Sequence, residues 1–423
     1  MENVWNKIRM IFMDKILRKR VVFVLLALVA FRLLANIPIP GVDITALERV
    51  INNNQLLGAF NILSGGGLSH LSIIMLGVGP YITGSIIMQL LTIMVPRLKS
   101  MYQEEGELGK KKFTQYGRIL TVPLAIIQGF SLILLLSKQG VLGDLTTFQM
   151  IANITIVVGG SMLLMWIGEL ISEFGIGNGV SLIIFAGIIA TIPQNISQFI
   201  YTFEVAKLPM YIIFLVVGLL IIAGVVLISE AERPIPVTYA KQVRGYGNAG
   251  GVQTYLPLRV NQAGVIPIIF GLSILMFPQI LGNLLASSTS SILLSISKGM
   301  LWFVNNSYAY AITYFILVFL FTYFYTAITF DPKQLADNLQ KGGAFIPGIR
   351  PGAATIEYIS NILTRITLVG ALFLGIIAVL PLVMKGITGI TSFALGGTAL
   401  LIVVSVVLDL IKKVEAQLSM REY

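Results

Sequence analysis

Long apolar stretches alternate with short polar connections along this 423-residue chain. A transmembrane helix needs about 20 mostly apolar residues, and ten stretches approach or reach that length. The pattern therefore predicts an all-α, polytopic membrane protein with spans at 21–37, 71–95, 119–136, 151–170, 180–200, 209–228, 260–281, 308–328, 364–384 and 393–411. Because ten is an even number, both ends of the chain are expected on the same side of the membrane.

The composition agrees with this class of protein. Apolar residues make up 56% of the chain and charged residues only 11%, whereas an ordinary soluble domain has about 25% charged residues. The absence of cysteine excludes disulfides, iron–sulfur clusters and thiolate metal sites. The single histidine, His70, excludes a metal site with two histidine ligands. No cofactor is expected.

Lysine and arginine gather on one side of the predicted spans. The side that holds both termini carries 23 of them, and the opposite side carries five. Under the positive-inside rule this bias places both termini in the cytosol. Membrane orientation and a cytosolic partner therefore account for the net charge of +10, which need not indicate nucleic-acid binding. Residues 1–20 have apolar positions one, three or four apart, which predicts an interfacial cytosolic helix and not a cleaved signal peptide.

Three segments between the spans have unusual compositions. Loops 229–259 and 329–363 are longer than ordinary helix–helix connections and combine glycine and proline with aromatic residues. This favours a docking surface for a partner over two structured but inert loops. Segment 57–68 is too short to span and holds three successive glycines, so it is expected inside the protein or as an external surface loop. Residues 77–80, Gly-Val-Gly-Pro, are expected to break or bend the second span.

Charges inside the spans are few. None of the 19 acidic residues lies centrally in a span, where ion-coupled transporters usually hold a carboxylate. An ion-coupled small-solute transporter is therefore the weaker alternative. No phosphate loop, nucleophile elbow or catalytic carboxylate pair is present, so an enzyme is not expected. Arg32 is the one charge well inside a span, and it is expected to snorkel or to pair with backbone carbonyls.

Short motifs are spread over nearly the whole chain, from about residue 20 to residue 413. They include Phe31-Arg32, Ile37-Pro38-Ile39-Pro40-Gly41, Ser64-Gly65-Gly66, Gly79-Pro80-Tyr81-Ile82, Trp166-Ile167-Gly168-Glu169, Gly175-Ile176-Gly177-Asn178-Gly179, Leu256-Pro257-Leu258-Arg259, Ala336-Asp337-Asn338-Leu339, Pro347-Gly348-Ile349-Arg350-Pro351-Gly352 and Gly396-Gly397-Thr398. Each motif alone is weak. Their order and their placement relative to the ten spans resemble the SecY family, the central subunits of bacterial protein-conducting channels.

The resemblance implies a gated channel in the bacterial plasma membrane that translocates unfolded polypeptides and releases membrane segments laterally into the bilayer. It implies two pseudo-symmetric five-helix halves, residues 21–205 and 206–411, followed by a cytosolic tail over 412–423. The implied partners are the small subunits SecE and SecG, the ATPase SecA, the ribosome, the signal sequences of preproteins and the lipid bilayer, without direct sequence-specific nucleic-acid binding.

The same resemblance implies four sets of site residues. The central constriction would be a ring of Val78, Ile82, Val180, Ile184, Ile269 and Ile402. A narrow apolar ring of this kind holds no water and stops hydrated ions. The plug that seals it would be segment 57–68, with Phe60, Asn61, Ser64, Gly65, Gly66 and Gly67. The lateral gate would hold Ser85, Gln89 and Thr92 on the second span and Asn261 and Ser273 on the seventh. Docking of the motor or the ribosome would involve Lys241, Arg244, Arg259 and Arg350.

Overall fold

The structure is a computed structural model that describes residues 13–40, 61, 64–143, 146–201, 204–205, 208–239, 253–286, 288, 290–388 and 392–419. Helices make up most of it: α2 (Lys15–Ala35), α5 (Gly79–Met94), α6 (Pro96–Gln103), α7 (Gly106–Lys138), α8 (Thr147–Phe174), α9 (Gly179–Tyr201), α10 (Leu208–Glu230), α11 (Ile266–Leu285), α12 (Ser291–Asn305), α13 (Ser307–Thr329), α14 (Pro332–Lys341), α15 (Ala353–Thr388) and α16 (Ser392–Ser419). Each predicted span overlaps one helix.

Among the described residues, six helices are long and apolar enough to cross a membrane: α7, α8, α10, α11, α13 and α15. Helices α5 and α6 give a seventh crossing if they are counted as one, although the chain bends by 112° between them. Pro96 causes the bend, because proline disfavours a helical conformation in the residue before it, and Val95 is extended. The predicted first, fifth and tenth spans correspond to α2, α9 and α16.

Three predicted boundaries differ from the structure. Residues 15–20, expected in a separate interfacial helix, are the first turns of α2, which Asp14 caps by accepting from the backbone N–H of Ile16 (2.7 Å); residues 1–12 lie outside the described part. The second span is expected from residue 71, but residues 64–78 form turns and α5 begins at Gly79. The predicted break at residues 77–80 is thus confirmed as a helix start. The seventh span is expected from residue 260, whereas α11 begins at Ile266.

A small sheet, which the apolar pattern did not predict, joins the two long loops. Strands β1 (Glu232–Tyr239) and β2 (Gln253–Arg259) form an antiparallel hairpin, and β3 (Ala344–Phe345) pairs with the last residues of β1, giving the order β2-β1-β3. The inward side chains of this sheet pack on the first turns of α15. The two loops are therefore parts of one folded unit.

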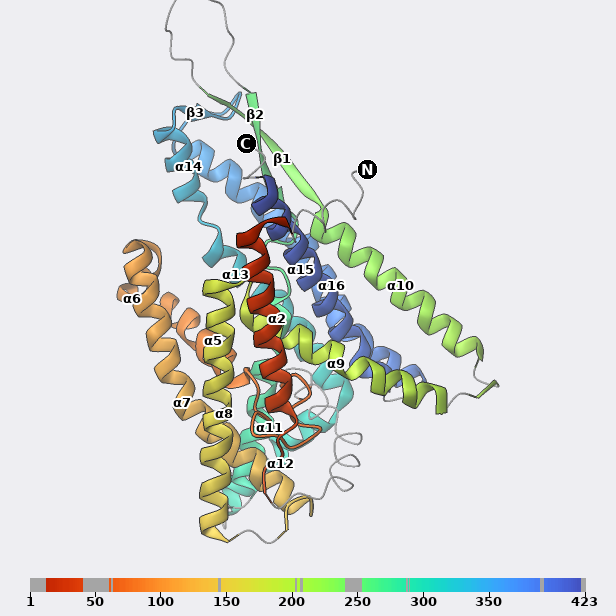
Figure 1. Ribbon diagram of the computed structural model, residues 1–423. Helices are drawn as coiled ribbons and strands as arrows, with labels where there is room; N and C mark the ends of the chain where they lie inside the picture. The colour runs from red at the N-terminus through yellow and green to blue at the C-terminus, as the bar shows by residue number, and fades with distance from the viewer. Residues whose placement is uncertain are drawn as a thin grey trace, which may run out of the picture.

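The sheet and α14 lie at one end of the molecule, called here the sheet end. In Figure 1 the start of α2, the end of α10, the start of α15 and the end of α16 lie at this end. The largest buried cluster lies among the long helices. It includes residues of α2, α5, α8, α9, α10, α11, α13, α15 and α16. Helix α11 packs on α12 and α13 and also contacts α5 and α7, so it touches both earlier and later helices of the chain.

Candidate functional site

Five of the six residues predicted to form the constriction are buried in one large apolar cluster. Val78, Ile82, Ile184, Ile269 and Ile402 belong to the largest buried cluster, and Val180 packs against it. None of the five cluster members is more than 6% exposed. They come from the turn before α5 and from α5, α9, α11 and α16. These positions therefore place β-branched, apolar side chains, which offer no hydrogen-bonding groups, in the buried core that the helices share.

A tight glycine turn, residues 64–69, packs beside this cluster. The N–H of Gly66 and the hydroxyl of Ser64 both donate to the carbonyl of Asn61, at 2.8 and 3.0 Å. The N–H of Ser69 donates to Asn61 Oδ1 at 2.9 Å. Gly65 and Gly66 have φ angles of 68° and 83°, a left-handed conformation that favours glycine. The glycine turn is thus closed by its own hydrogen bonds.

Glycines let the turn approach α2 and α9 closely. A Cβ atom on Gly65 would lie 2.5 Å from Cζ of Phe31, and a Cβ atom on Gly187 would overlap Cα of Gly65. Gly67 is equally confined, because its Cβ would lie 2.9 Å from the carbonyl oxygen of Ile74. Phe60, the remaining predicted plug residue, lies outside the described residues. The part of the predicted plug that the structure describes therefore has a shaped seat between α2 and α9.

The chain that follows the glycine turn is held by hydrogen bonds to other segments. The N–H of Ile39 donates to the carbonyl of Leu71 at 2.8 Å, and the N–H of Ile73 donates to the carbonyl of Ile37 at 2.9 Å. The hydroxyl of Ser161 on α8 donates to the carbonyl of Gly77 at 3.0 Å. Residues 71–77 are therefore anchored, whereas the glycine turn meets α2 and α9 through packing.

Four of the five residues predicted for the lateral gate fall into two classes. The hydroxyls of Thr92 and Ser273 donate to carbonyls of their own helices, at 2.6 and 2.9 Å, and Ser85 lies on α5. The amide oxygens of Gln89 and Asn261 are buried without a hydrogen-bond partner among the described residues. The placement of Asn261 on the seventh span is wrong: it lies in the turn before α11, where its Nδ2 donates to the carbonyl of Gly264 at 3.3 Å.

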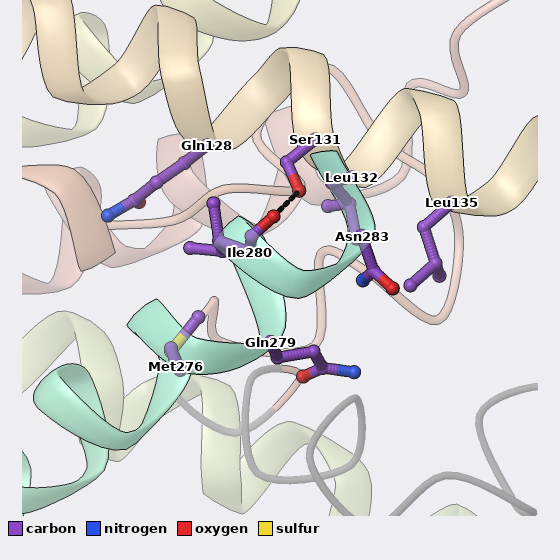
Figure 2. A pocket seen from close by; sticks show the side chains of 8 residues that line it. All are labelled: Gln128, Ser131, Leu132, Leu135, Met276, Gln279, Ile280 and Asn283. Atoms are coloured by element: carbon purple, nitrogen blue, oxygen red, sulfur yellow. Dashed lines mark hydrogen bonds between the residues drawn. The ribbon is translucent and has the colours of Figure 1, made fainter. Parts of the chain in front are cut away.

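A second polar contact, between α7 and α11, was not predicted. These helices enclose a cavity of about 30 Å³. Figure 2 shows the side chains that line it, which are Gln128, Ser131, Leu132, Leu135, Met276, Gln279, Ile280 and Asn283. The hydroxyl of Ser131 donates to the carbonyl of Ile280 at 3.3 Å. Gln128 is only 5% exposed, and its Oε1 has no partner among the described residues. The only signal in the sequence was two polar residues one helical turn apart in an apolar span.

The predicted docking residues divide between described and undescribed parts. Arg350 is exposed in the turn between β3 and α15, and its carbonyl accepts from the hydroxyl of Thr355 at 3.1 Å. Arg259 ends β2 and its Nε lies 3.3 Å from Oε1 of Glu232. Lys241 and Arg244 lie outside the described residues. The structure thus places two of the four predicted cations at the sheet end.

Comparison with known proteins decides the family. A family model described as SecY matches residues 72–411. The chain belongs to the SecY family. The protein translocase subunit SecY of Streptomyces galbus is 40% identical over 428 residues and that of Mycobacterium tuberculosis 40% over 433 residues, each match covering 96% of both chains. The SecY subunit of Streptomyces coelicolor is 41% identical over 425 residues.

Solved structures show that this SecY family member has the channel fold. A protein-conducting channel matches with a TM-score of 0.62 at 19% identity, covering 93% of this chain and 91% of that chain. Sec61 from the canine ribosome–channel complex matches with a TM-score of 0.60 at 18% identity over the same shares. The predicted class, an all-α polytopic membrane protein, is confirmed as a mostly helical one that also holds the small sheet. The protein is a bacterial protein-conducting channel subunit of the Sec translocase and, as predicted, not an enzyme.

Proposed function

We propose that Val78, Ile82, Val180, Ile184, Ile269 and Ile402 form the constriction through which unfolded polypeptides pass. The observation that carries this proposal is that five of them share one buried apolar cluster, with Val180 packed against it. Such a ring excludes ions because it offers no groups to replace their hydration shells. It accepts polypeptides of any sequence because aliphatic side chains make no specific hydrogen bonds.

The glycine turn is the described part of the proposed plug. Two close approaches support this role: the turn packs on Phe31 of the buried cluster, and it meets Gly187, which follows the proposed ring residue Ile184 by three positions on α9. A related SecY protein of known structure, with a TM-score of 0.64 at 20% identity, has a plug domain that stabilises the closed state of its channel and maintains a membrane seal.

The sheet end is proposed to face the cytosol, where SecA or a ribosome would dock on the sheet and on Arg350. The excess of Lys and Arg in the connections at this end supports that orientation. Residues 21–205 and 206–411 would be the two halves, hinged between α9 and α10. Contacts of α11 with α5 and α7, and of α16 with α9, would join the halves. Small subunits of the SecE and SecG type would cover apolar surface such as that of α10, which is 12% buried.

A hydrophobic signal sequence would open the lateral gate by separating α11 from α5 and α7. We expect Gln128→Leu to oppose this opening, because it replaces a buried amide oxygen that has no partner among the described residues with an apolar side chain at the contact between α7 and α11. Relief of an unsatisfied buried group is worth about 1–3 kcal/mol. The variant should export a preprotein with a weakly hydrophobic signal several-fold more slowly, as measured by protease protection in proteoliposomes.

Gln139→Leu is the matched control for this prediction, because it makes the same chemical change at an exposed position beyond the end of α7. If Gln128→Leu and the unmodified channel export the preprotein at equal rates, the α7–α11 contact has no role in opening the gate.

Gly187→Ala is expected to unseat the glycine turn. The new methyl group would overlap Cα of Gly65. If the free energy that favours the seated turn falls by about 1–2 kcal/mol, the ion leak should rise roughly tenfold. Conductance of planar bilayers holding the channel measures the effect. Gly159→Ala on α8 is the control, since a Cβ atom there meets nothing within 4 Å. A leak equal in the two variants would show that the seat does not seal the ring.

The experiment that tests the whole proposal is reconstitution into proteoliposomes with SecE, SecG, SecA, ATP and a preprotein that bears a signal sequence. Passage through the channel predicts an ATP-dependent fraction of preprotein that is protected from added protease. A channel that binds SecA but leaves all of the preprotein accessible to protease would contradict it.

A further inference from the structure

Arg32 lies in the last turn of α2 and faces the glycine turn. Its Nη1 is buried and has no hydrogen-bond partner among the described residues. The same nitrogen lies 3.7 Å from the position that a Cβ atom on Gly66 would occupy. The expectation that Arg32 pairs with backbone carbonyls is therefore wrong for this nitrogen. A desolvated guanidinium nitrogen is left against the part of the chain proposed to be the plug.

The glycine turn offers Arg32 few free acceptors because it satisfies its own carbonyls. The carbonyl of Gly66 accepts from the hydroxyl of Ser69 at 2.7 Å. The carbonyl of Gly67 accepts from the N–H and the hydroxyl of Ser72, at 2.9 and 3.0 Å. The carbonyl of Ser64 accepts from the N–H of Gly67 at 3.4 Å. If the turn moved as a unit it would keep the bonds to Gly66 and Ser64, whereas the bonds to Gly67 tie its end to the anchored Ser72.

The walls around the seat do not replace these acceptors. Phe31, next to Arg32 on α2, packs its ring against Gly65. Thr191 on α9 points its methyl group at Gly66, with Cγ2 3.6 Å from the Cβ position, while its hydroxyl donates to the carbonyl of Ile188 on its own helix at 2.8 Å. The nearest groups of the seat are thus a ring, a methyl group and glycine backbone.

We propose that Arg32 makes the closed channel easier to open, because the seated turn keeps one guanidinium nitrogen away from water. Leaving a charged donor buried and unpaired is unfavourable. Departure of the turn would expose Nη1 to the aqueous passage and relieve that penalty. Arg32 would then act on the position of the plug and not on the polypeptide itself. The inference rests on the proposed role of the glycine turn as the plug.

The test measures ion leak through the complete reconstituted translocase in planar bilayers without preprotein. Arg32→Met keeps the length of the side chain and removes the charge, so it is expected to lower the leak about tenfold. Arg32→Gln, which is shorter and neutral, should shift the leak in the same direction. Arg20→Met is the matched control, because Arg20 is exposed at the opposite end of α2.

A second background separates the inference from the proposed function. In a channel that lacks residues 64–67 the leak should be high, and Arg32→Met should then change nothing. If the deletion does not raise the leak, the glycine turn is not the plug and both ideas are wrong. If the deletion raises the leak but Arg32→Met and Arg32→Gln leave it unchanged or increase it in the intact channel, the inference alone is wrong. Failure of both variants to assemble in the membrane would make Arg32 a folding residue and would also overturn it.

Discussion

Charge reversal at Arg350 is expected to abolish motor-driven export while the channel remains folded. The side chain is exposed in the turn between β3 and α15, so Arg350→Glu should change the free energy of unfolding by no more than about 0.5 kcal/mol. The backbone of the turn is fixed independently of the arginine head group, through Thr355 and through Ile346, which is 2% exposed. The reversed charge would repel an acidic surface on the docked motor.

The measurement for Arg350→Glu is SecA-driven translocation of a preprotein into proteoliposomes, with a reduction of tenfold or more, about 1.4 kcal/mol, as the expected result. Lys333→Glu is the matched control, because Lys333 is exposed in the first turn of α14 at the same end of the molecule. An acidic residue at that helix start is compatible with the helix dipole. Normal export by Arg350→Glu would show that Arg350 does not take part in docking the motor.

Polar substitution of the ring should make the resting channel leak. Ile82 and Ile184 are 6% and 1% exposed in the shared cluster, and asparagine at both positions would let water and hydrated ions enter. We expect Ile82→Asn with Ile184→Asn to raise the conductance of planar bilayers roughly tenfold. The same change should lower stability by about 1–3 kcal/mol for each buried amide left unpaired.

A control that loosens packing without adding a polar group separates the effect of polarity from that of loosened structure. Ile82→Val with Ile184→Val keeps a β-branched apolar ring and costs about 0.5–1.5 kcal/mol at each site. It should leave the conductance low. A leak of the same size in the valine and asparagine channels would show that packing, and not the absence of polar groups, blocks ions at this point.

The apolar pattern alone located ten of the thirteen helices among the described residues, because a bilayer demands long apolar segments, and it missed the shorter α6, α12 and α14. The helix start at residues 77–80 was also readable, since Gly77 takes a left-handed conformation and Pro80 suits a first turn. Residues of the ring lie on distant helices, and no spacing in one sequence tells which faces meet. Their grouping came from the resemblance to SecY proteins; five of them lie in the largest buried cluster, and their meeting in one ring stays a prediction.

The sheet was missed because its central strand carries two prolines. Pro234 and Pro236 argue against a strand with neighbours on both sides. In the structure β3 pairs only with Thr238 and Tyr239, so the prolines lie where β1 has β2 as its sole partner. Strand β1 is therefore a central strand over two residues and an edge strand over the rest. This depends on β3, which lies about 100 residues further along the chain.

The role of Gln128 depends on a tertiary contact, whereas the position of Asn261 depends on the local start of α11. Gln128 matters because it meets α11 across a cavity, and α11 is more than 130 residues away in sequence. Asn261 was assigned to a span because it adjoins an apolar run, but Gly264 has a φ of 62° and Pro267 lies in the first turn of α11. Both features start the helix after Asn261.

The most direct measurement of the central claim is cross-linking of a stalled polypeptide to the ring. The chain has no cysteine, so Ile82→Cys, Ile184→Cys and Ile402→Cys each supply a single thiol, and Ile212→Cys supplies one on the exposed face of α10, where Ile212 is 55% exposed. A preprotein halted during translocation, with one cysteine in its sequence, should form disulfides with the three ring positions and not with position 212. Disulfides with position 212 and none with the ring would contradict passage through these residues.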